Sequence, residues 1–393
     1  MTLFSWLTVA AAGAVVLAAA IARGRTYATF AAVLLGLQSA VAIALAPHFE
    51  WCFPLYYYLQ AALLIHFALL IRARMRPLVY RALVSIPASF FLAGTLLAIP
   101  WGIAAFAGFN PWGAWIPFVI ALFGVIQSLR HRFEVIDIAL EGEAVATLRR
   151  HPRGAARTGR PLRIVQITDP HLGVFMSMER LRGVCERAVA KNPDVVFLTG
   201  DFLTMESHGD HMLLAHALAP LAALPGRVFA CRGNHDHEAP ETVAAALSLV
   251  GAKLLIDDAA EIDTPAGPIQ IVGMDFAWRN RKERMAQVCA EHPRQPGRLR
   301  VILLHDPGAF QHLGEGEGDL VLSGHTHGGQ LGLLSLGLPY TVVSAFGGMP
   351  DHGLWARGTD RLYVHRGTGH YGFPLRLGVP AEESLLCVHF AKG

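Results

Sequence analysis

Charged side chains are almost absent from the first third of the chain, and this absence limits the possible folds more than any other feature. Residues 1–129 contain only seven charged side chains: Arg23, Arg25, Glu50, Arg72, Arg74, Arg76 and Arg81. Over all 393 residues, 53% are hydrophobic and only 16% are charged, whereas a soluble domain carries about 25% charge. Most of the charge therefore belongs to the later residues, and we expect two regions that lie in two different solvents.

The apolar region is long enough to cross a membrane several times, since one span needs about 20 apolar helical residues. The first three predicted spans are 3–22, 27–46 and 51–71. No charge occurs between Arg81 and Arg130, and this stretch is more than twice the length that one span needs. A turn-forming cluster at 108–113 divides it into two further spans. We therefore predict a transmembrane region at 1–129 with about five helices.

The arginines indicate an orientation, because short loops rich in Lys and Arg stay in the cytoplasm. Arginine follows the first, third and fifth predicted spans, whereas the second and fourth loops carry none. This alternation predicts a multi-pass protein of the inner (plasma) membrane, with everything after Arg130 in the cytoplasm. The rival for the first span is a cleaved signal peptide, since residues 18–20 resemble a cleavage site, but no positive residue precedes the apolar run.

The predicted spans contain the polar residues Gln38, Gln60 and His66. Polar residues inside a membrane mark either a transport path or hydrogen bonds between helices. Because each of the three is isolated in the sequence, we favour hydrogen bonds between helices.

After residue 161, short apolar runs alternate with helical patterns. The predicted strands are 163–168, 195–198, 228–231, 269–273, 299–304, 320–322, 362–364 and 385–390, and the predicted helices are 178–190, 211–223 and 241–250. This alternation predicts one α/β layered domain over 162–393. Residues 130–161 are expected to be a juxtamembrane linker, to which 133–140 could add an edge strand. The arginine-rich part of this linker, 149–160, is expected to lie against anionic headgroups.

Asp, Asn and His cluster at the points where the predicted strands end. The five blocks are Asp169-Pro170-His171, Gly200-Asp201, Gly233-Asn234-His235-Asp236, His305-Asp306 and Gly324-His325-Thr326-His327. The carboxyl ends of strands in an α/β sheet converge on one crevice, so the five blocks are expected to meet. Each block alone is weak, but together they provide the oxygen and nitrogen donors that two divalent transition ions need.

In this order, the five blocks resemble the motifs of the calcineurin-like metallophosphoesterase superfamily over about 162–388. The resemblance implies an α/β/β/α sandwich and a hydrolase of phosphoric esters or diphosphates. Residues 324–330 and 362–377 are similar to a membrane-linked bacterial branch that includes UDP-2,3-diacylglucosamine hydrolases. Pro170 departs from the larger apolar residue that is more usual there, and it is expected to change the shape of the loop rather than the chemistry.

The resemblance also implies roles for individual residues. One ion would be held by Asp169, His171 and His327, the other by Asn234, His305 and His325, with Asp201 shared between them. Two such ions, whether Mn, Fe or Zn, would generate a hydroxide near neutral pH and neutralise the phosphoryl oxygens. His235 is expected to be catalytic, either by protonating the leaving oxygen or by stabilising charge on the phosphoryl group, and Asp236 is expected to orient its ring.

The predicted function is that of a membrane-anchored phosphohydrolase that cleaves a phosphoester or pyrophosphate bond. Its substrate would be lipid-linked or a nucleotide sugar, such as UDP-diacylglucosamine, and its other partners membrane lipids. A net charge of +3 gives no reason to expect nucleic acid. The alternative is a membrane transporter or receptor with a regulatory, non-catalytic phosphoesterase-like domain. The apolar segment 331–350 either lines a path for an acyl chain or forms a buried strand with a covering loop.

Overall fold

The computed structural model describes residues 2–140, 144–154 and 159–390. The chain divides into two compact units. One unit comprises Met1–Leu129 together with Gly372–Leu377, and the other comprises Arg130–Tyr371 together with Gly378–Gly393. A short segment from late in the chain thus packs with the helices at its beginning, and each unit is described below by itself.

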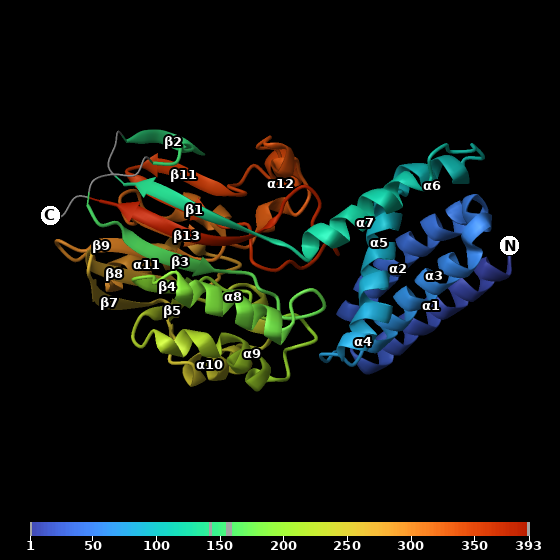
Figure 1. The fold of residues 1–393 in the computed structure, drawn as a ribbon, viewed down its shortest axis with the longest axis horizontal. Coiled ribbons are helices and arrows are strands. Elements are labelled where there is room, and N and C mark those ends of the chain that lie inside the picture. Colours follow the sequence, from blue (N-terminus) through green and yellow to red (C-terminus); the bar gives the residue numbers. More distant parts are fainter. Residues whose placement is uncertain (1, 141–143, 155–158, 391–393) are drawn as a thin grey trace. The chain divides into compact units, whose positions relative to one another are not determined.

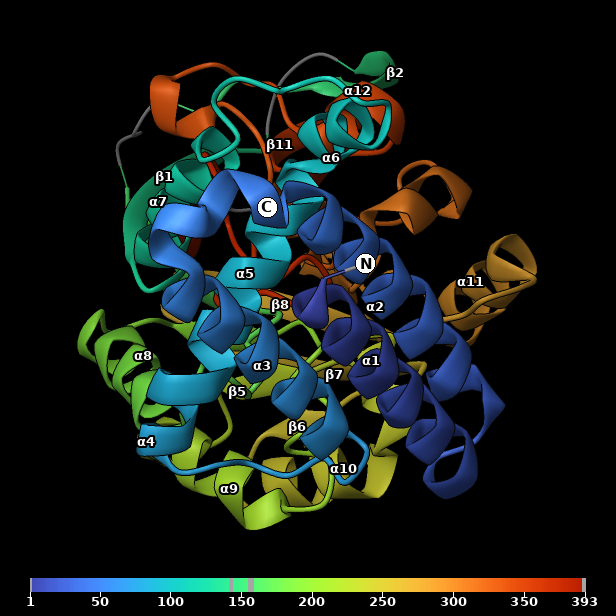
Figure 2. The ribbon, with the colours of Figure 1, turned by 90° about the vertical axis from the view of Figure 1, so that its right-hand side faces the viewer.

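The first unit is helical (Figures 1 and 2). Its helices are α1 (Leu3–Ala22), α2 (Arg25–Leu45), α3 (Phe53–Leu70), α4 (Leu78–Tyr80), α5 (Ile86–Leu97), α6 (Ile99–Phe106) and α7 (Ile116–Ser128). A 3-10 segment, η1 (Ala46–Cys52), joins α2 to α3, and a π-helical turn, η2 (Arg81–Ser85), joins α4 to α5. The chain between α6 and α7 turns at 107–115, at the predicted cluster of Gly, Asn and Pro.

Three helical stretches are apolar and long enough to cross a membrane: Leu3–Ala22, Arg25–Leu70 and Leu78–Leu97. The second of them comprises α2 and α3 with the bend at Phe49, whose φ of −118° and ψ of 19° are not helical. Helix α7 is apolar too, but its 13 residues span only about 20 Å at 1.5 Å per residue. Long apolar N-terminal helices confirm the prediction from composition, while the number of crossings stays a prediction.

Polar side chains inside this unit join neighbouring helices. Nε2 of Gln38 in α2 donates to Oε1 of Gln60 in α3 at 2.9 Å, and both side chains are buried. The hydroxyl of Tyr56 donates to the carbonyl of Ala42 across the same pair of helices at 2.8 Å. The predicted helix-to-helix hydrogen bonds of Gln38 and Gln60 are therefore confirmed, whereas that of His66 stays a prediction.

The second unit is built on two β-sheets. The first sheet has the strand order β1-β13-β3-β4-β5-β6 and the second β2-β11-β12-β10-β9-β8-β7. The strands of the first are β1 (His131–Ala139), β13 (Ala381–His389), β3 (Leu162–Ile167), β4 (Val195–Leu198), β5 (Val228–Ala230) and β6 (Lys253–Leu254). Those of the second are β2 (Val145–Arg150), β11 (Gly353–Gly358), β12 (Asp360–Val364), β10 (Leu320–Ser323), β9 (Leu299–Leu304), β8 (Gly267–Met274) and β7 (Asp258–Thr264).

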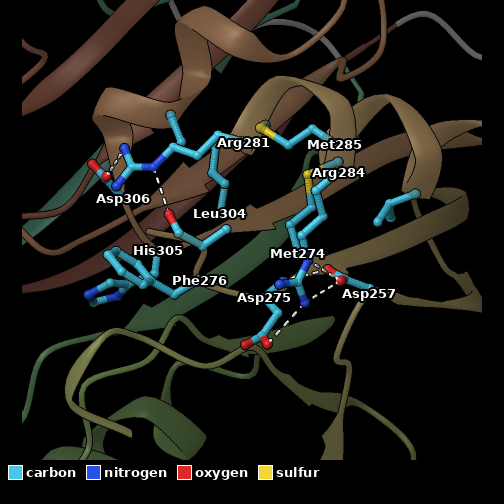
Figure 3. Close-up of a pocket in the computed structure, with 13 residues that line it drawn as sticks. Asp257, Met274, Asp275, Phe276, Arg281, Arg284, Met285, Leu304, His305 and Asp306 are labelled. Atoms are coloured by element: carbon cyan, nitrogen blue, oxygen red, sulfur yellow. Dashed lines mark hydrogen bonds and ion pairs between the residues drawn. The ribbon is translucent and has the colours of Figure 1, made fainter. Parts of the chain in front are cut away.

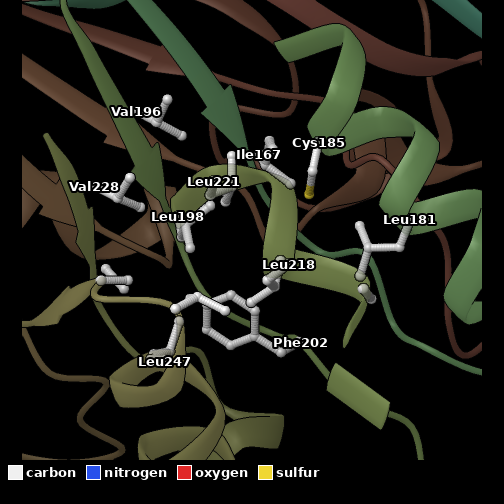
Figure 4. Close-up of a cluster of buried hydrophobic side chains, with 14 of the residues drawn as sticks. Ile167, Leu181, Cys185, Val196, Leu198, Phe202, Leu218, Leu221, Val228 and Leu247 are labelled. Carbon is white, nitrogen blue, oxygen red and sulfur yellow. The ribbon is translucent and has the colours of Figure 1, made fainter. Parts of the chain in front are cut away.

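Three apolar clusters hold the layers of this unit together. Side chains from both sheets, including Ile164, Phe197 and Leu303, form the core between the sheets. On its other face the first sheet packs against α8 (Met178–Ala190), α9 (His211–Leu218) and α10 (Pro240–Leu249), as Figure 4 shows. The second sheet packs against α11 (Arg281–Glu291) and the 3-10 turn η5 (Pro307–His312). The unit is therefore an α/β/β/α sandwich, as predicted.

The segment expected to be a linker contributes two strands. β1 forms the edge of the first sheet and pairs in parallel with β13, in the segment for which the sequence offered an edge strand at 133–140. β2 was not predicted; it pairs antiparallel with β11, so residues 149–150 lie in a strand rather than in the linker. The reason is tertiary, because the partner β11 comes about two hundred residues later. Two parts of the predicted linker, 141–143 and 155–158, lie outside the described residues.

Candidate metal centre

The five polar blocks follow five strands whose carboxyl ends lie at one edge of the sandwich. β3, β4 and β5 run parallel in the first sheet, and β9 and β10 run parallel in the second. The loops after β3 and β4 are joined at the site itself, because the backbone N–H groups of Asp169 and His171 donate to the carbonyls of Gly200 and Asp201. The strand ends thus bring the predicted site residues together.

The site residues form two groups, each compact enough for one ion. Asp169, His171 and His327 make up one group, and Asp201, His305 and His325 the other; within each, one nitrogen or carboxylate oxygen per residue lies within 4.8 Å of the others. Nε2 of His171 lies 3.6 Å from Oδ2 of Asp201, so Asp201 also faces the first group. The predicted ligand Asn234 has a buried Oδ1 with no hydrogen-bond partner.

Backbone carbonyls orient the imidazoles. Nδ1 of His305 lies 2.6 Å from the carbonyl oxygen of Thr199, and Nδ1 of His171 lies 3.3 Å from that of Leu203. Nδ1 of each ring is therefore held by a carbonyl, and Nε2 is the nitrogen left to face the site. Nε2 of His171 and of His305 is buried without a hydrogen-bond partner. Buried polar atoms are rarely left unpaired, so these two nitrogens and Oδ1 of Asn234 fit a site for divalent cations.

Burial and charge set the protonation of these groups. Burial lowers the pKa of His171 to about 3 and that of His325 to about 4, which keeps both rings neutral, as metal ligands must be. Burial also disfavours the charged form of His305, but the carboxylates of Asp201 and Asp169 outweigh it and raise its pKa to about 10. The second group thus favours a positive charge at the place where an ion would lie.

The backbone at the site is strained. Nine non-glycine residues in the described part of the chain have positive φ, and five of them are site residues: Asp169, His171, Asp201, His325 and His327. Such conformations are costly and persist where the surroundings enforce them, often at functional sites. Gly324 allows the close packing, because a Cβ there would lie 2.2 Å from Oδ2 of Asp169 and 2.2 Å from Oγ1 of Thr168.

The predicted catalytic His235 lies beside the two groups, and the residue that holds its ring is not the predicted Asp236. Nδ1 of His235 lies 2.8 Å from Oε1 of Glu238 in the 3-10 turn η4 (His235–Glu238). Asp236 does not orient the ring; its fully buried carboxylate accepts from the backbone N–H groups of Asp201, Phe202 and Gly233. Asp236 thus braces the loops that carry Asp201 and Asn234, because its side chain points into the backbone and not toward the imidazole.

Residues 162–329 match the family model of the calcineurin-like phosphoesterases. This part of the chain belongs to the calcineurin-like metallophosphoesterase family. The match covers the five polar blocks and the strands that carry them.

Curated relatives agree with this assignment. The chain is 29% identical over 232 residues to phosphodiesterase YaeI of Escherichia coli, covering 58% of this chain and 82% of the relative. It is 28% identical over 278 residues to the UDP-2,3-diacylglucosamine pyrophosphatase LpxG of Chlamydia trachomatis, covering 57% and 83%. It is 28% identical over 252 residues to a transmembrane protein with a metallophosphoesterase domain of Bos taurus, covering 58% and 53%. The chain therefore carries a metallophosphoesterase domain, with candidate ligand groups for divalent ions.

Aromatic rings line the metallophosphoesterase site, and the sequence did not single them out. The ring of Tyr371 stacks on His171, with centroids 5.1 Å apart, and meets the ring of His235 edge-on at 4.9 Å. On the other side, Phe276 lies 6.1 Å from the ring of His325. Glu238 could have been found from its spacing of three residues from His235, but Tyr371 comes two hundred residues after His171 and carries no local signal.

A small pocket of about 20 Å³ adjoins His305 and Phe276 (Figure 3), which is room for about one water molecule. Two arginines line it, and each is paired with a carboxylate. Arg281 lies 2.7 Å from Asp306, and Arg284 lies 2.5 Å from Asp257. These ion pairs fix the walls of the pocket beside the site.

Proposed function

We propose that this chain is a membrane-anchored metallophosphoesterase that hydrolyses a phosphoester or pyrophosphate bond in a lipid-linked or nucleotide-sugar substrate, such as UDP-diacylglucosamine. The pairing of two ligand groups at one edge of the sandwich is the observation that carries the proposal. The apolar N-terminal helices support a substrate that is found at a membrane. The name of the chlamydial relative, a UDP-2,3-diacylglucosamine pyrophosphatase, supports the substrate class.

In this proposal, Asp169, His171 and His327 hold one divalent ion, and Asn234, His305 and His325 hold the other, with Asp201 facing both. Mn, Fe and Zn all suit this set of donors. Bound there, the two ions would lower the pKa of water and neutralise charge on the phosphoryl oxygens. The carbonyls of Leu203 and Thr199 hold the imidazoles in the tautomer that such ions require.

The role proposed for His235 is to donate a proton to the departing oxygen. Burial lowers its pKa, but the hydrogen bond and charge of Glu238 outweigh this, and the net shift is upward. A raised pKa keeps a proton on the ring near neutral pH. Glu238 holds Nδ1, so Nε2 is the atom that can donate, and Tyr371 limits the rotation of the ring from its edge.

Hydrolysis of bis-p-nitrophenyl phosphate by the full chain in detergent, with Mn²⁺, tests the activity. We expect a chelator to abolish turnover and Asp201→Ala to lower kcat at least about a hundredfold. His235→Ala should lower kcat much less on this substrate, because p-nitrophenolate departs without a proton. His211→Ala is the matched control, because His211 is exposed on α9. Turnover that is indifferent to the chelator and to Asp201→Ala would refute the proposal and favour a regulatory, non-catalytic domain.

We also propose that the metallophosphoesterase domain faces the cytoplasm from an inner (plasma) membrane. The alternation of arginine-rich and arginine-free loops supports this orientation. A reporter fused after Gly393 should be active only in the cytoplasm. Activity of the reporter outside the cytoplasm would contradict both the orientation and the count of five spans.

A further inference from the structure

An apolar surface projects from the second unit directly after the metal-ligand block. It consists of six large apolar side chains that are 42% to 88% exposed: Leu333, Leu336, Leu338, Tyr340, Val342 and Phe346. Twelve large hydrophobic side chains are exposed in the described residues after Leu129. Half of these twelve lie in one stretch of 14 residues, 333–346. We call this surface the apolar loop. It is not the buried strand that one interpretation of the sequence had offered.

The exposure of the apolar loop is built into the fold. The N–H of Leu333 donates to the carbonyl of Tyr340, and the N–H of Val342 donates to the carbonyl of Leu331. Thr341 caps the helix α12 (Val342–Phe346) with a capping box, and its hydroxyl donates to Asp351 at 2.5 Å. Hydrogen bonds of the backbone and of the cap therefore hold the loop in shape, while its large side chains point to solvent.

The apolar loop carries no charge, but it ends beside arginines. No Asp, Glu, Lys or Arg occurs between Gly328 and Pro350. The next residue, Asp351, accepts from Arg150 of β2 at 2.5 Å, and the neighbouring Arg149 is exposed. An apolar projection bordered by arginine is the arrangement by which proteins dip into the headgroup layer of an anionic membrane.

A bilayer is also within reach of this unit by chain continuity. Arg130 follows directly on α7, and three helical stretches before it are apolar and long enough to cross a membrane. Any lipid surface that these helices occupy is therefore present at high effective concentration for the second unit. The chain link to the apolar helices, the arginines beside the apolar loop and the absence of charge within it all favour lipid, and not a second copy of the chain, as the partner of the loop.

We infer that the apolar loop is a bilayer-docking surface, which inserts Leu336 and Phe346 into the headgroup layer of an anionic membrane. The loop is packed on the site: a Cβ at Gly329, two residues after His327, would lie 3.1 Å from the backbone nitrogen of Val343 in α12. Docking therefore holds the metal centre at the depth of phosphorylated headgroups. This consequence for the substrate rests on the proposed function, whereas the docking itself does not.

Fluorescence quenching on the full chain in anionic proteoliposomes tests the docking. Single cysteines at Phe346 and at Leu336, in a Cys52→Ser background, carry an environment-sensitive dye; the other four native cysteines are buried. Leu249→Cys is the matched control, because Leu249 is 59% exposed on α10. We expect lipids with a nitroxide near the headgroup to quench the dye at 346 and 336 at least about twofold more than at 249, and aqueous iodide to show the reverse order.

Two results would overturn the inference. Quenching by iodide at 346 and 336 as strong as at 249, without quenching by the nitroxide lipid, would show a surface that stays in water. Protection from iodide without quenching by the lipid would show that a protein covers the loop.

Turnover provides a second, separable measurement. Leu336→Glu with Phe346→Glu should lower hydrolysis of a bilayer-embedded phosphoester about tenfold and leave hydrolysis of the soluble chromogenic diester unchanged; an equal loss on both substrates would count against docking. Leu249→Glu should change neither rate. If the unaltered protein hydrolyses neither substrate, the proposed function fails, and the quenching result still decides the docking.

Discussion

Nδ1 of His235 lies 2.8 Å from Oε1 of Glu238, three residues further along the same 3-10 turn. This pair predicts that Glu238 positions the proton donor. We expect Glu238→Gln to lower kcat about tenfold for substrates with a poor, alkyl leaving group, because these need a proton. Turnover of p-nitrophenyl esters should change much less, because their leaving group departs without one. Steady-state kinetics on the two ester classes measures the difference.

The control for Glu238 is Glu241→Gln, because Glu241 is exposed in the first turn of α10. Metal content, measured by mass spectrometry, should stay the same in both variants. An equal loss on both ester classes, or a loss of metal, would show that Glu238 supports the fold of the loop and does not act through His235.

Gly324→Ala should disrupt the metal site by a steric clash. A Cβ at this position would lie 2.2 Å from Oδ2 of Asp169 and 2.2 Å from Oγ1 of Thr168, so the Asp169 carboxylate must move. We expect at least about a tenfold loss of metal affinity and a corresponding loss of turnover. Gly209→Ala is the control, because nothing lies within 4 Å of a Cβ there. Titration calorimetry with Mn²⁺ measures the metal affinity of both variants. An unchanged affinity in Gly324→Ala would contradict the predicted steric clash.

The Glu382 carboxylate should stabilise the folded protein at neutral pH, and this stabilisation should be lost at low pH. Burial raises the pKa of its carboxyl, but His365, Arg366 and the hydroxyl of Tyr363 outweigh burial and lower it to about 2. The folded state therefore gains stability above the ordinary value of 4.5 and loses it as the pH falls toward about 2. A shift of this size corresponds to roughly 3 kcal/mol.

Glu382→Gln tests this dependence in thermal unfolding of the full chain between pH 7 and pH 2. The variant should unfold at lower temperature than the unaltered protein at neutral pH, and the gap should narrow as the pH falls below about 4. Glu261→Gln is the control, because its side chain is 46% exposed. A gap that stays constant with pH would contradict a contribution from the charge of Glu382.

Gln38 and Gln60 should be coupled energetically across α2 and α3. Their side-chain hydrogen bond of 2.9 Å is buried, and hydrogen bonds between membrane helices contribute about 0.6 kcal/mol on average. A double-mutant cycle of Gln38→Leu and Gln60→Leu should therefore give a coupling energy of about 0.5 to 1.5 kcal/mol. Unfolding of the four proteins in mixed micelles measures it, and strictly additive losses would show that the bond contributes nothing.

The sequence alone predicted that the two regions of the chain lie in different solvents, and it identified the residue types of the site. The near-absence of charge before Arg130 predicts apolar helices wherever they pack, because hydropathy is a property of the local chain. The five blocks of Asp, Asn and His follow strands, and the ends of parallel strands meet at one edge of any α/β sheet. Both conclusions depend on short segments, so they needed no knowledge of the packing.

The tertiary structure decided what depends on contacts between distant segments. Asp236 turned out to brace backbone N–H groups, and Glu238 took the role of orienting His235, because the path of the loop and not the spacing decides which carboxylate reaches the ring. Tyr371 reaches His171 only through the packing of the last strands. The apolar loop is exposed for the same reason: hydropathy marks the side chains at 333–346 as apolar, but only the folded backbone determines whether anything covers them.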